Sequence, residues 1–353
     1  MKSLKYVIVF LLIIQFFLPS QLSLADVYHN RIDYERVKSN LHDLDAVMQQ
    51  IQKEIKRKKL QDYIIILGDS VLFGSPGNSD QSVNVFMQEQ PGAPAIFNLS
   101  MPAMQLGDYY VMMLKLKKFG ISTDNLILNI RYAMFIERDP FPSPVFWLAD
   151  ELRGLDREAY DRVLTPLKNA GFKPPSTPFQ WYKYFLHHVV LPKVGLFRYK
   201  DNIKLDYYHD YLKLTGKPIP GDALGDSRPW FEKDFADFMH DPQLLQSFSD
   251  KPFDLTENSP DIYFLNKMTA FQEGKKTLVL LTGTNHEMMK EHVNKPGYIA
   301  NMQALNAYMA KQPFQYADLE GRIPDSLFTD HTHLTPEGYH RMADLIWQEW
   351  NRR

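Results

Sequence analysis

Tyr63-Ile64-Ile65-Ile66-Leu67-Gly68-Asp69-Ser70 is the stretch that decides the fold, because an apolar run ends there abruptly at Gly-Asp-Ser. A short run of β-branched residues is typical of a strand buried on both faces, and a glycine at its end lets the backbone turn sharply. The sequence therefore predicts a strand with Ser70 just beyond its carboxyl end. Ligands bind at this edge in open α/β sheets. Asp and Ser are also ordinary helix N-cap residues, so the tripeptide alone does not specify a site.

Four more strand-like runs follow, at about 95–97, 126–130, 276–281 and 314–319. Helical patterns separate them, and this alternation is typical of βαβ units and a parallel sheet. Between about 133 and 259 the alternation is lost and the chain becomes rich in proline and aromatic residues. We interpret this part as a large, mostly helical insertion, either a structural cap or a lid over substrate.

The N-terminus has the features of a secretory signal. Lys2 and Lys5 precede an apolar run over 6–18, and Ser23-Leu24-Ala25 forms a small-x-small site. We predict a signal peptide over 1–25, with an uncleaved N-terminal anchor as the alternative. Both place the rest of the protein outside the cytoplasm, secreted or held at the outer face of the cytoplasmic membrane. If the N-terminal segment is uncleaved, we expect it to be the only part of the protein that contacts a membrane.

Residues 26–60 are predicted to form an amphipathic helix. One face carries apolar residues at alternating spacings of three and four: Tyr34, Val37, Leu41, Leu44, Met48, Ile51 and Ile55. Such a seam needs a partner surface. It packs against its own domain or, alternatively, serves as a docking element for another protein.

The composition excludes several classes of function. The chain has 353 residues and a net charge of -2, which gives no electrostatic reason to expect nucleic acid as a partner. It has no cysteine, which rules out disulfides, thiolate metal sites and a cysteine nucleophile. No metal-ligand spacing stands out in the insertion, and we expect neither a metal nor an organic cofactor.

Ser70, Asp330 and His333 form the constellation that can carry chemistry. A serine hydroxyl needs a base within hydrogen-bond reach, and a histidine base needs a carboxylate to fix its tautomer. Asp330 stands three residues before His333, so both reach one another from a single loop. We expect the sheet to bring this loop over Ser70, with Ser70 as nucleophile, His333 as base and Asp330 as its partner.

Gly68-Asp69-Ser70 near the start and Asp330-His331-Thr332-His333 near the end resemble the first and last blocks of the SGNH/GDSL hydrolase superfamily. The resemblance covers roughly 61–135 and 260–353. It implies a three-layer α/β/α sandwich with a five-stranded parallel sheet, of the flavodoxin-like kind, and it assigns the same three roles to the same three residues.

The resemblance also implies an oxyanion hole. Its donors would be the Ser70 backbone N–H and that of Ala103, which matches a glycine of the family. The third block departs from the family, because the sequence has no Gly-x-Asn-Asp after residues 126–128. Asn129 comes too early, and Arg131 and Tyr132 are left as candidates for the third donor.

An exported N-terminus, a large insertion and an altered third block together look like the divergent branch that acts on cell-envelope polymers, similar to alginate O-acetyltransferases and the D-alanine transfer protein of teichoic-acid synthesis. The implied function is a serine esterase or O-acyltransferase acting on an acylated carbohydrate or another small ester. Asn285 and His286 follow the fourth strand and are candidates for substrate contact. The alternative is a non-catalytic glycan-binding or scaffold protein on the same fold.

Overall fold

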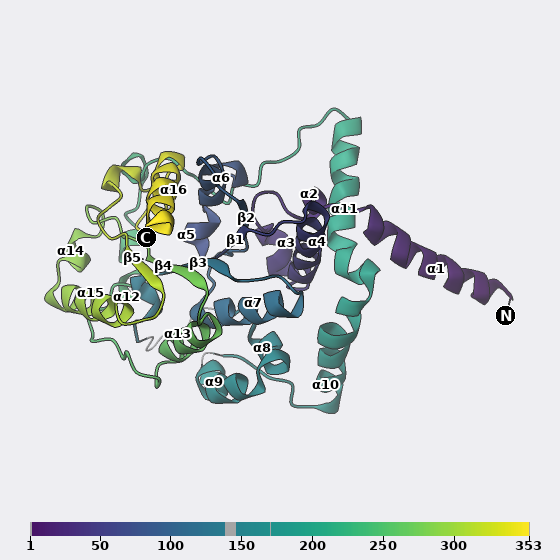
Figure 1. Ribbon diagram of the computed structural model, residues 1–353, viewed down its shortest axis with the longest axis horizontal. Helices are drawn as coiled ribbons and strands as arrows, with labels where there is room; N and C mark the ends of the chain where they lie inside the picture. Colours follow the sequence, from purple (N-terminus) through teal and green to yellow (C-terminus); the bar gives the residue numbers. More distant parts are fainter. Residues whose placement is uncertain (1, 138–145, 170, 353) are drawn as a thin grey trace. The chain divides into compact units, whose positions relative to one another are not determined.

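The computed structural model describes residues 2–137, 146–169 and 171–352, and these residues include a parallel sheet (Figure 1). Its five strands are β1 (Tyr63–Leu67), β2 (Ala95–Asn98), β3 (Asn125–Ile130), β4 (Lys276–Leu281) and β5 (Gln315–Asp318). They pair in the order β2-β1-β3-β4-β5, and every pair is parallel. The predicted α/β fold with a five-stranded parallel sheet is confirmed. The order reverses between β1 and β3, which is where doubly wound sheets of this kind bind ligands.

Helices lie on both sides of the sheet (Figure 1). On one side α6 (Val83–Gln88) and α16 (Pro336–Asn351) pack together, over a core that includes Ile64 and Ile66 of β1. On the other side α7 (Leu106–Lys118) packs against α13 (Pro260–Phe271), and Gly107 allows this close approach. A Cβ at Gly107 would lie 2.9 Å from the Phe264 ring. The arrangement is compatible with three layers.

The remaining helical segments are short or lie in the connections. They are α5 (Ser70–Phe73), α8 (Ala149–Leu155), α9 (Arg157–Asn169), α12 (Pro242–Gln246), α14 (Lys290–Val293) and α15 (Pro296–Met309). Single 3₁₀ turns occur at Ser79–Gln81, Tyr132–Met134, Trp230–Glu232, Phe238–His240 and Asp325–Leu327.

The chain divides into two compact units. The sheet unit contains residues 61–172 and 222–353, and the helical unit combines residues 1–60 with 173–221. The segment read as one insertion over 133–259 is therefore shared between the two units, and its residues 138–145 lie outside the described part. The sequence pattern did not reveal this division, because the pieces of the helical unit are more than a hundred residues apart.

The helical unit contains α1 (Lys2–Gln21), α2 (Leu24–Val27), α3 (Tyr34–Ser39), α4 (Asp43–Lys58), α10 (Pro178–Phe185) and α11 (Gly195–Leu214). Between the last two lie a π-helical turn, Leu186–Val190, and a 3₁₀ turn, Leu191–Lys193. None of the described helices is long and apolar enough to cross a membrane.

The predicted helix over 26–60 is three helices in the structure. Asp33 caps α3 by accepting a hydrogen bond from Arg36 N at 3.1 Å, and Asn40 ends it with extended backbone angles. In α4 the seam residues Leu44, Met48 and Ile51 are fully buried. They lie on a helix that packs against α2 and α11, so the chain's own helices cover much of this seam.

Candidate active site

The turn after β1 places Ser70 at the carboxyl edge of the sheet. Asp69 caps α5, because its Oδ1 accepts a hydrogen bond from Val71 N at 2.9 Å. Gly68 is required by close packing: a Cβ there would lie 2.6 Å from Asn129 Oδ1 and 2.9 Å from Ser100 Oγ. Ser70 therefore begins a helix immediately beyond a fully buried strand, and its side chain is only partly buried.

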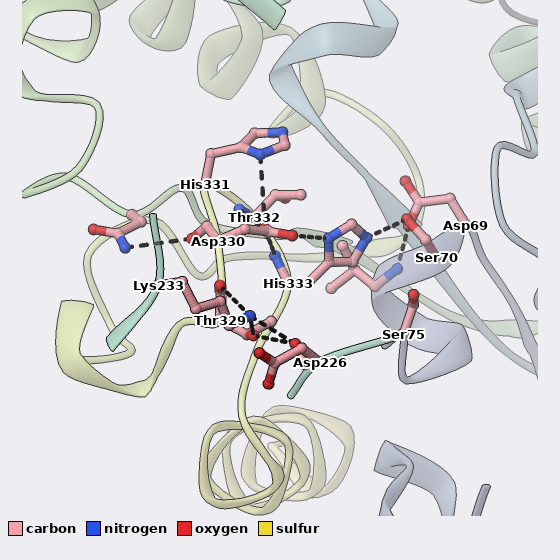
Figure 2. A network of polar contacts seen from close by, with 12 residues as sticks. Asp69, Ser70, Ser75, Asp226, Lys233, Thr329, Asp330, His331, Thr332 and His333 are labelled. Atoms are coloured by element: carbon pink, nitrogen blue, oxygen red, sulfur yellow. Dashed lines mark hydrogen bonds and ion pairs between the residues drawn. The ribbon is translucent and has the colours of Figure 1, made fainter. Parts of the chain in front are cut away.

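Ser70, His333 and Asp330 form a continuous hydrogen-bonded chain (Figure 2). His333 Nε2 lies 2.8 Å from Ser70 Oγ, and His333 Nδ1 lies 2.7 Å from Asp330 Oδ2. Asp330 Oδ1 accepts hydrogen bonds from the backbone N–H groups of Thr332 and His333, both at 2.8 Å. The structure thus brings the three predicted residues together from opposite ends of the chain.

Asp330 is held in its ionised form. Burial raises its pKa, but the His333 ring and the hydrogen bonds from His333 outweigh this and keep the pKa well below the ordinary value. An ionised carboxylate can only accept, so His333 Nδ1 carries the hydrogen that is donated to Asp330. His333 Nε2 is then the acceptor that faces Ser70, which is the arrangement of a general base beside a nucleophile.

A buried polar network lies under the Ser70 turn. Asp69 is fully buried, and its carboxylate forms an ion pair through Oδ2 with Arg131 Nε. Asn129 projects from β3, where its Nδ2 donates to Asp69 Oδ1 at 3.0 Å and its Oδ1 accepts from Asp69 N at 3.1 Å. Tyr109 of α7 donates to the same amide oxygen at 3.2 Å. β3 therefore fixes the turn that carries Ser70.

Asn285 supports the loop of Asp330 and His333 from β4. Its backbone N–H donates to His331 O at 3.0 Å and its Nδ2 to Asp330 O at 3.3 Å. Asn285 was predicted as a substrate contact, but it is fully buried and its amide is engaged with the backbone. In this position it holds the loop and offers no polar group to a substrate.

His286, the other predicted contact residue, is partly exposed and paired. Its Nε2 lies 2.7 Å from Glu320 Oε1, and this hydrogen bond raises its pKa above the ordinary value despite partial burial. Tyr298 also donates to Glu320 Oε1, at 3.0 Å. The His286 ring is therefore held at the carboxyl edge of the sheet by the loop that follows β5.

Residues from the middle of the chain also form hydrogen bonds with the loop that carries Asp330 and His333 (Figure 2). Lys233 Nζ donates to Thr329 O at 2.9 Å and to Asp226 O at 2.6 Å. Trp230 N donates to Phe328 O at 2.9 Å. Sequence reasoning missed this contact, because Lys233 and Trp230 lie in a proline-rich and aromatic stretch without regular periodicity.

The loop after β2 lies beside the Ser70 turn, because Met101 N donates to Gly68 O at 3.0 Å. Ala103 on this loop has a φ of 63°, in the left-handed region that favours glycine. The family resemblance places a glycine at this position, and this match stays a prediction. Among the described residues, neither the Ser70 N–H nor the Ala103 N–H makes a hydrogen bond.

The two candidates for a third oxyanion donor differ in position. Arg131 Nε is engaged with Asp69, next to Ser70 in the chain, and the Arg131 side chain is 20% exposed. The Tyr132 hydroxyl donates to Ser249 O at 2.6 Å and accepts from Asn301 Nδ2 at 2.8 Å. The Tyr132 hydroxyl is therefore already hydrogen-bonded to other parts of the sheet unit. Of the two side chains, only that of Arg131 bonds to the turn that carries Ser70.

A small cavity of about 20 Å³ lies beside the triad loop, room for about one water molecule. It is lined by Arg131, Tyr132, Ala133, Ser247, Phe248, Thr282, Thr284, His331 and Thr332. Burial lowers the pKa of His331 to about 4, so this ring is neutral at pH 7.

A larger hollow of about 490 Å³ includes Thr123 and Lys275, at the amino ends of β3 and β4. None of the predicted site residues lines it, so it does not belong to this site.

Comparisons with known proteins do not assign a family. No family model matches the chain, and no curated protein matches it. Ten chains of solved structures match. One of them, a crystal structure, has 12% sequence identity and a TM-score of 0.34, over 81% of this chain and 94% of that chain. A likeness at this level carries no argument about function.

Proposed function

We propose that this protein is an exported serine-dependent esterase or O-acyltransferase with an SGNH-like, three-layer α/β/α fold, working through an acyl-Ser70 intermediate. One observation carries the proposal: His333 Nε2 lies 2.8 Å from Ser70 Oγ while Nδ1 of the same ring lies 2.7 Å from Asp330 Oδ2. Further support comes from the position of Ser70 at the ligand-binding edge of a doubly wound sheet.

In the first half of the proposed reaction, His333 Nε2 takes the proton of the Ser70 hydroxyl as Oγ attacks the carbonyl carbon of an ester. The carbonyl electrons move onto oxygen and give a tetrahedral intermediate. The intermediate collapses by breaking the bond to the alcohol, and His333 returns its proton to the departing alkoxide. Asp330, held ionised, stabilises the imidazolium that forms between these steps.

In the second half, a hydroxyl from water or from a sugar gives its proton to His333 and attacks the acyl-Ser70 carbonyl. Collapse of this second intermediate releases the acid or the new ester, and the proton returns to Ser70. We assign the oxyanion to the N–H groups of Ser70 and Ala103. Loss of one such donor typically lowers the rate about 10²- to 10³-fold, so the absence of the family's third donor predicts slower turnover than a complete hole gives.

The proposed substrate is an O-acylated cell-envelope or extracellular polysaccharide. This choice rests on the secretory features of residues 1–25 and on the resemblance to polymer-modifying proteins. The second candidate is a glycan-binding or scaffold protein, with the helical seam of 34–55 as a docking element. The altered third block favours it, but such a protein does not need Ser70, His333 and Asp330 to be hydrogen-bonded.

Hydrolysis of p-nitrophenyl acetate by the purified protein tests the proposal, alongside Ser70→Ala and His333→Ala. We expect turnover that falls at least about 10³-fold in either variant, because a triad works as a unit. A fluorophosphonate probe separates the two candidates. Labelling that requires Ser70 supports the enzyme, whereas a folded protein without labelling supports the scaffold.

A further inference from the structure

Exposed apolar side chains are concentrated in the helical unit. Nineteen large apolar side chains of the described residues are exposed, and seventeen of them belong to residues 1–60 and 173–221. The other two are Phe231 and Ile299. Single exposed apolar residues are normal on a soluble protein, but a concentration of this kind marks a surface that something covers.

α10 is the clearest part of this surface. Five of its eight residues are aromatic, and none of its residues is buried. Phe179, Tyr182 and Phe185 are 64%, 60% and 54% exposed. The chain continues from α10 through two short turns into α11 (Figure 1), where Tyr207, Tyr208 and Tyr211 are also exposed. An amphipathic helix with no buried residue leaves much of its apolar face open to solvent.

The same segment is basic. Residues 178–217 contain seven Lys and Arg and three Asp, with no Glu, which leaves a net charge of +4 in a chain whose total is -2. Lys183 Nζ lies 4.7 Å from the centre of the Phe179 ring, so cation and aromatic ring occupy one patch. Basic residues beside an apolar face are the pattern of helices that lie in the headgroup region of anionic bilayers.

The residue types favour lipid over a second copy of this chain. Trp and Tyr prefer the membrane interface, where the ring is buried in the acyl boundary and the polar edge stays wet. A symmetric dimer through this segment would place two basic faces against each other, which is electrostatically unfavourable.

The apolar helix α1 belongs to the same unit and contacts α11, since a Cβ at Gly195 of α11 would lie 3.2 Å from the Pro19 ring of α1.

We propose that the aromatic and basic face of α10 and α11 is a membrane-binding surface for anionic lipid, in addition to the N-terminal segment. We call it the α10–α11 face. The helices lie in the plane of the interface, with the aromatic rings in the acyl boundary and the exposed Lys side chains among the headgroups.

The test is the partition of the full-length protein onto vesicles of phosphatidylglycerol and phosphatidylcholine in equal parts. The variant combines Phe179→Ser, Tyr182→Ser and Phe185→Ser, and the matched control combines Phe231→Ser and Ile299→Ser. We expect the triple variant to lose about tenfold or more in partition, since binding scales with buried apolar area, and the control to match wild type. Partition of wild type onto pure phosphatidylcholine is expected to be weaker. A folded triple variant that partitions like wild type overturns the proposal, because α1 then accounts for all binding.

Trp181 gives a second readout that needs no destabilising change. It is the only tryptophan of the helical unit, whereas four lie in the sheet unit. Brominated lipids should quench part of the protein's tryptophan fluorescence on anionic vesicles, and Trp181→Phe should abolish that quenching while partition persists. Absence of quenching in bound wild type, or a dimer in light scattering that the triple variant dissociates, would assign the face to another occupant.

Discussion

Replacing Arg131 by Gln leaves Asp69 as a buried carboxylate without its ion-pair partner. Asp69 is fully buried, whereas the Arg131 side chain is 20% exposed, so the carboxylate bears most of the loss. Its Oδ1 keeps hydrogen bonds from Val71 N and Asn129 Nδ2, and only Oδ2 loses its donor. Removing one partner of a fully buried pair costs about 3–5 kcal/mol, and an orphaned polar atom about 1–3 kcal/mol.

We therefore expect Arg131→Gln to lower the free energy of unfolding by about 3 kcal/mol at pH 7, the value where these two estimates meet. For a unit of this size the melting temperature should fall by about 6–12 °C. The assay is urea unfolding followed by both circular dichroism and tryptophan fluorescence, so that two-state behaviour is checked.

A double-mutant cycle isolates the pair. The double variant Asp69→Asn with Arg131→Gln removes charge and partner together, and we expect it to be at least about 1 kcal/mol more stable than the sum of the single changes predicts. If Arg131→Gln stays within about 0.5 kcal/mol of wild type, the size of an ordinary surface change, then the network under the Ser70 turn does not stabilise it as argued.

Three further predictions concern the same unit. Gly68→Ala should lower the free energy of unfolding in urea by about 1–3 kcal/mol, because the new Cβ would lie 2.6 Å from a buried amide oxygen. In the control Gly77→Ala the atom nearest the new Cβ would lie 3.6 Å away, so this change should lower the free energy of unfolding much less. Equal losses of stability in the two variants would contradict the role of Gly68 in packing. Lys233→Met should lower kcat for p-nitrophenyl acetate about tenfold, because it releases Thr329 and with it the loop that carries Asp330 and His333. An unchanged kcat would show that Lys233 does not position this loop. Burial lowers the pKa of His331 to about 4 in the folded protein, whereas the pKa in the unfolded chain is about 6.5. As the pH falls, the unfolded chain therefore binds a proton at His331 before the folded protein does. The free energy of unfolding should fall as the pH falls from about 6.5 to about 4. His331→Gln should flatten that part of the stability profile, and a slope unchanged from wild type would exclude His331 as its source.

The sheet could be predicted because its strands are short runs of buried apolar residues. β1 is fully buried, and four apolar residues in succession leave little choice of structure. Ser70, Asp330 and His333 could be located because a nucleophile, a base and a carboxylate are chemically distinctive and follow predicted strands or precede a predicted helix. Local sequence was sufficient for both.

Pairings across the sheet could not be predicted in the same way. Asn129 reads as one polar residue inside a strand, and its role depends on β3 lying next to β1, which brings it to Asp69. Lys233 acts on Thr329 from a stretch without regular periodicity. The helical unit could not be predicted for the same reason, since residues 1–60 and 173–221 are far apart in the sequence and come together only in the folded protein.

The most direct test of the central claim is the intact mass of the protein, followed by peptide mapping, after rapid quenching of its reaction with p-nitrophenyl acetate. We expect one acetyl group on Ser70 in wild type and none in Ser70→Ala, with His333→Ala acylated far more slowly. A folded wild-type protein that turns over the ester without acetyl on Ser70, or whose acetyl group persists at another residue in Ser70→Ala, would contradict the proposed mechanism.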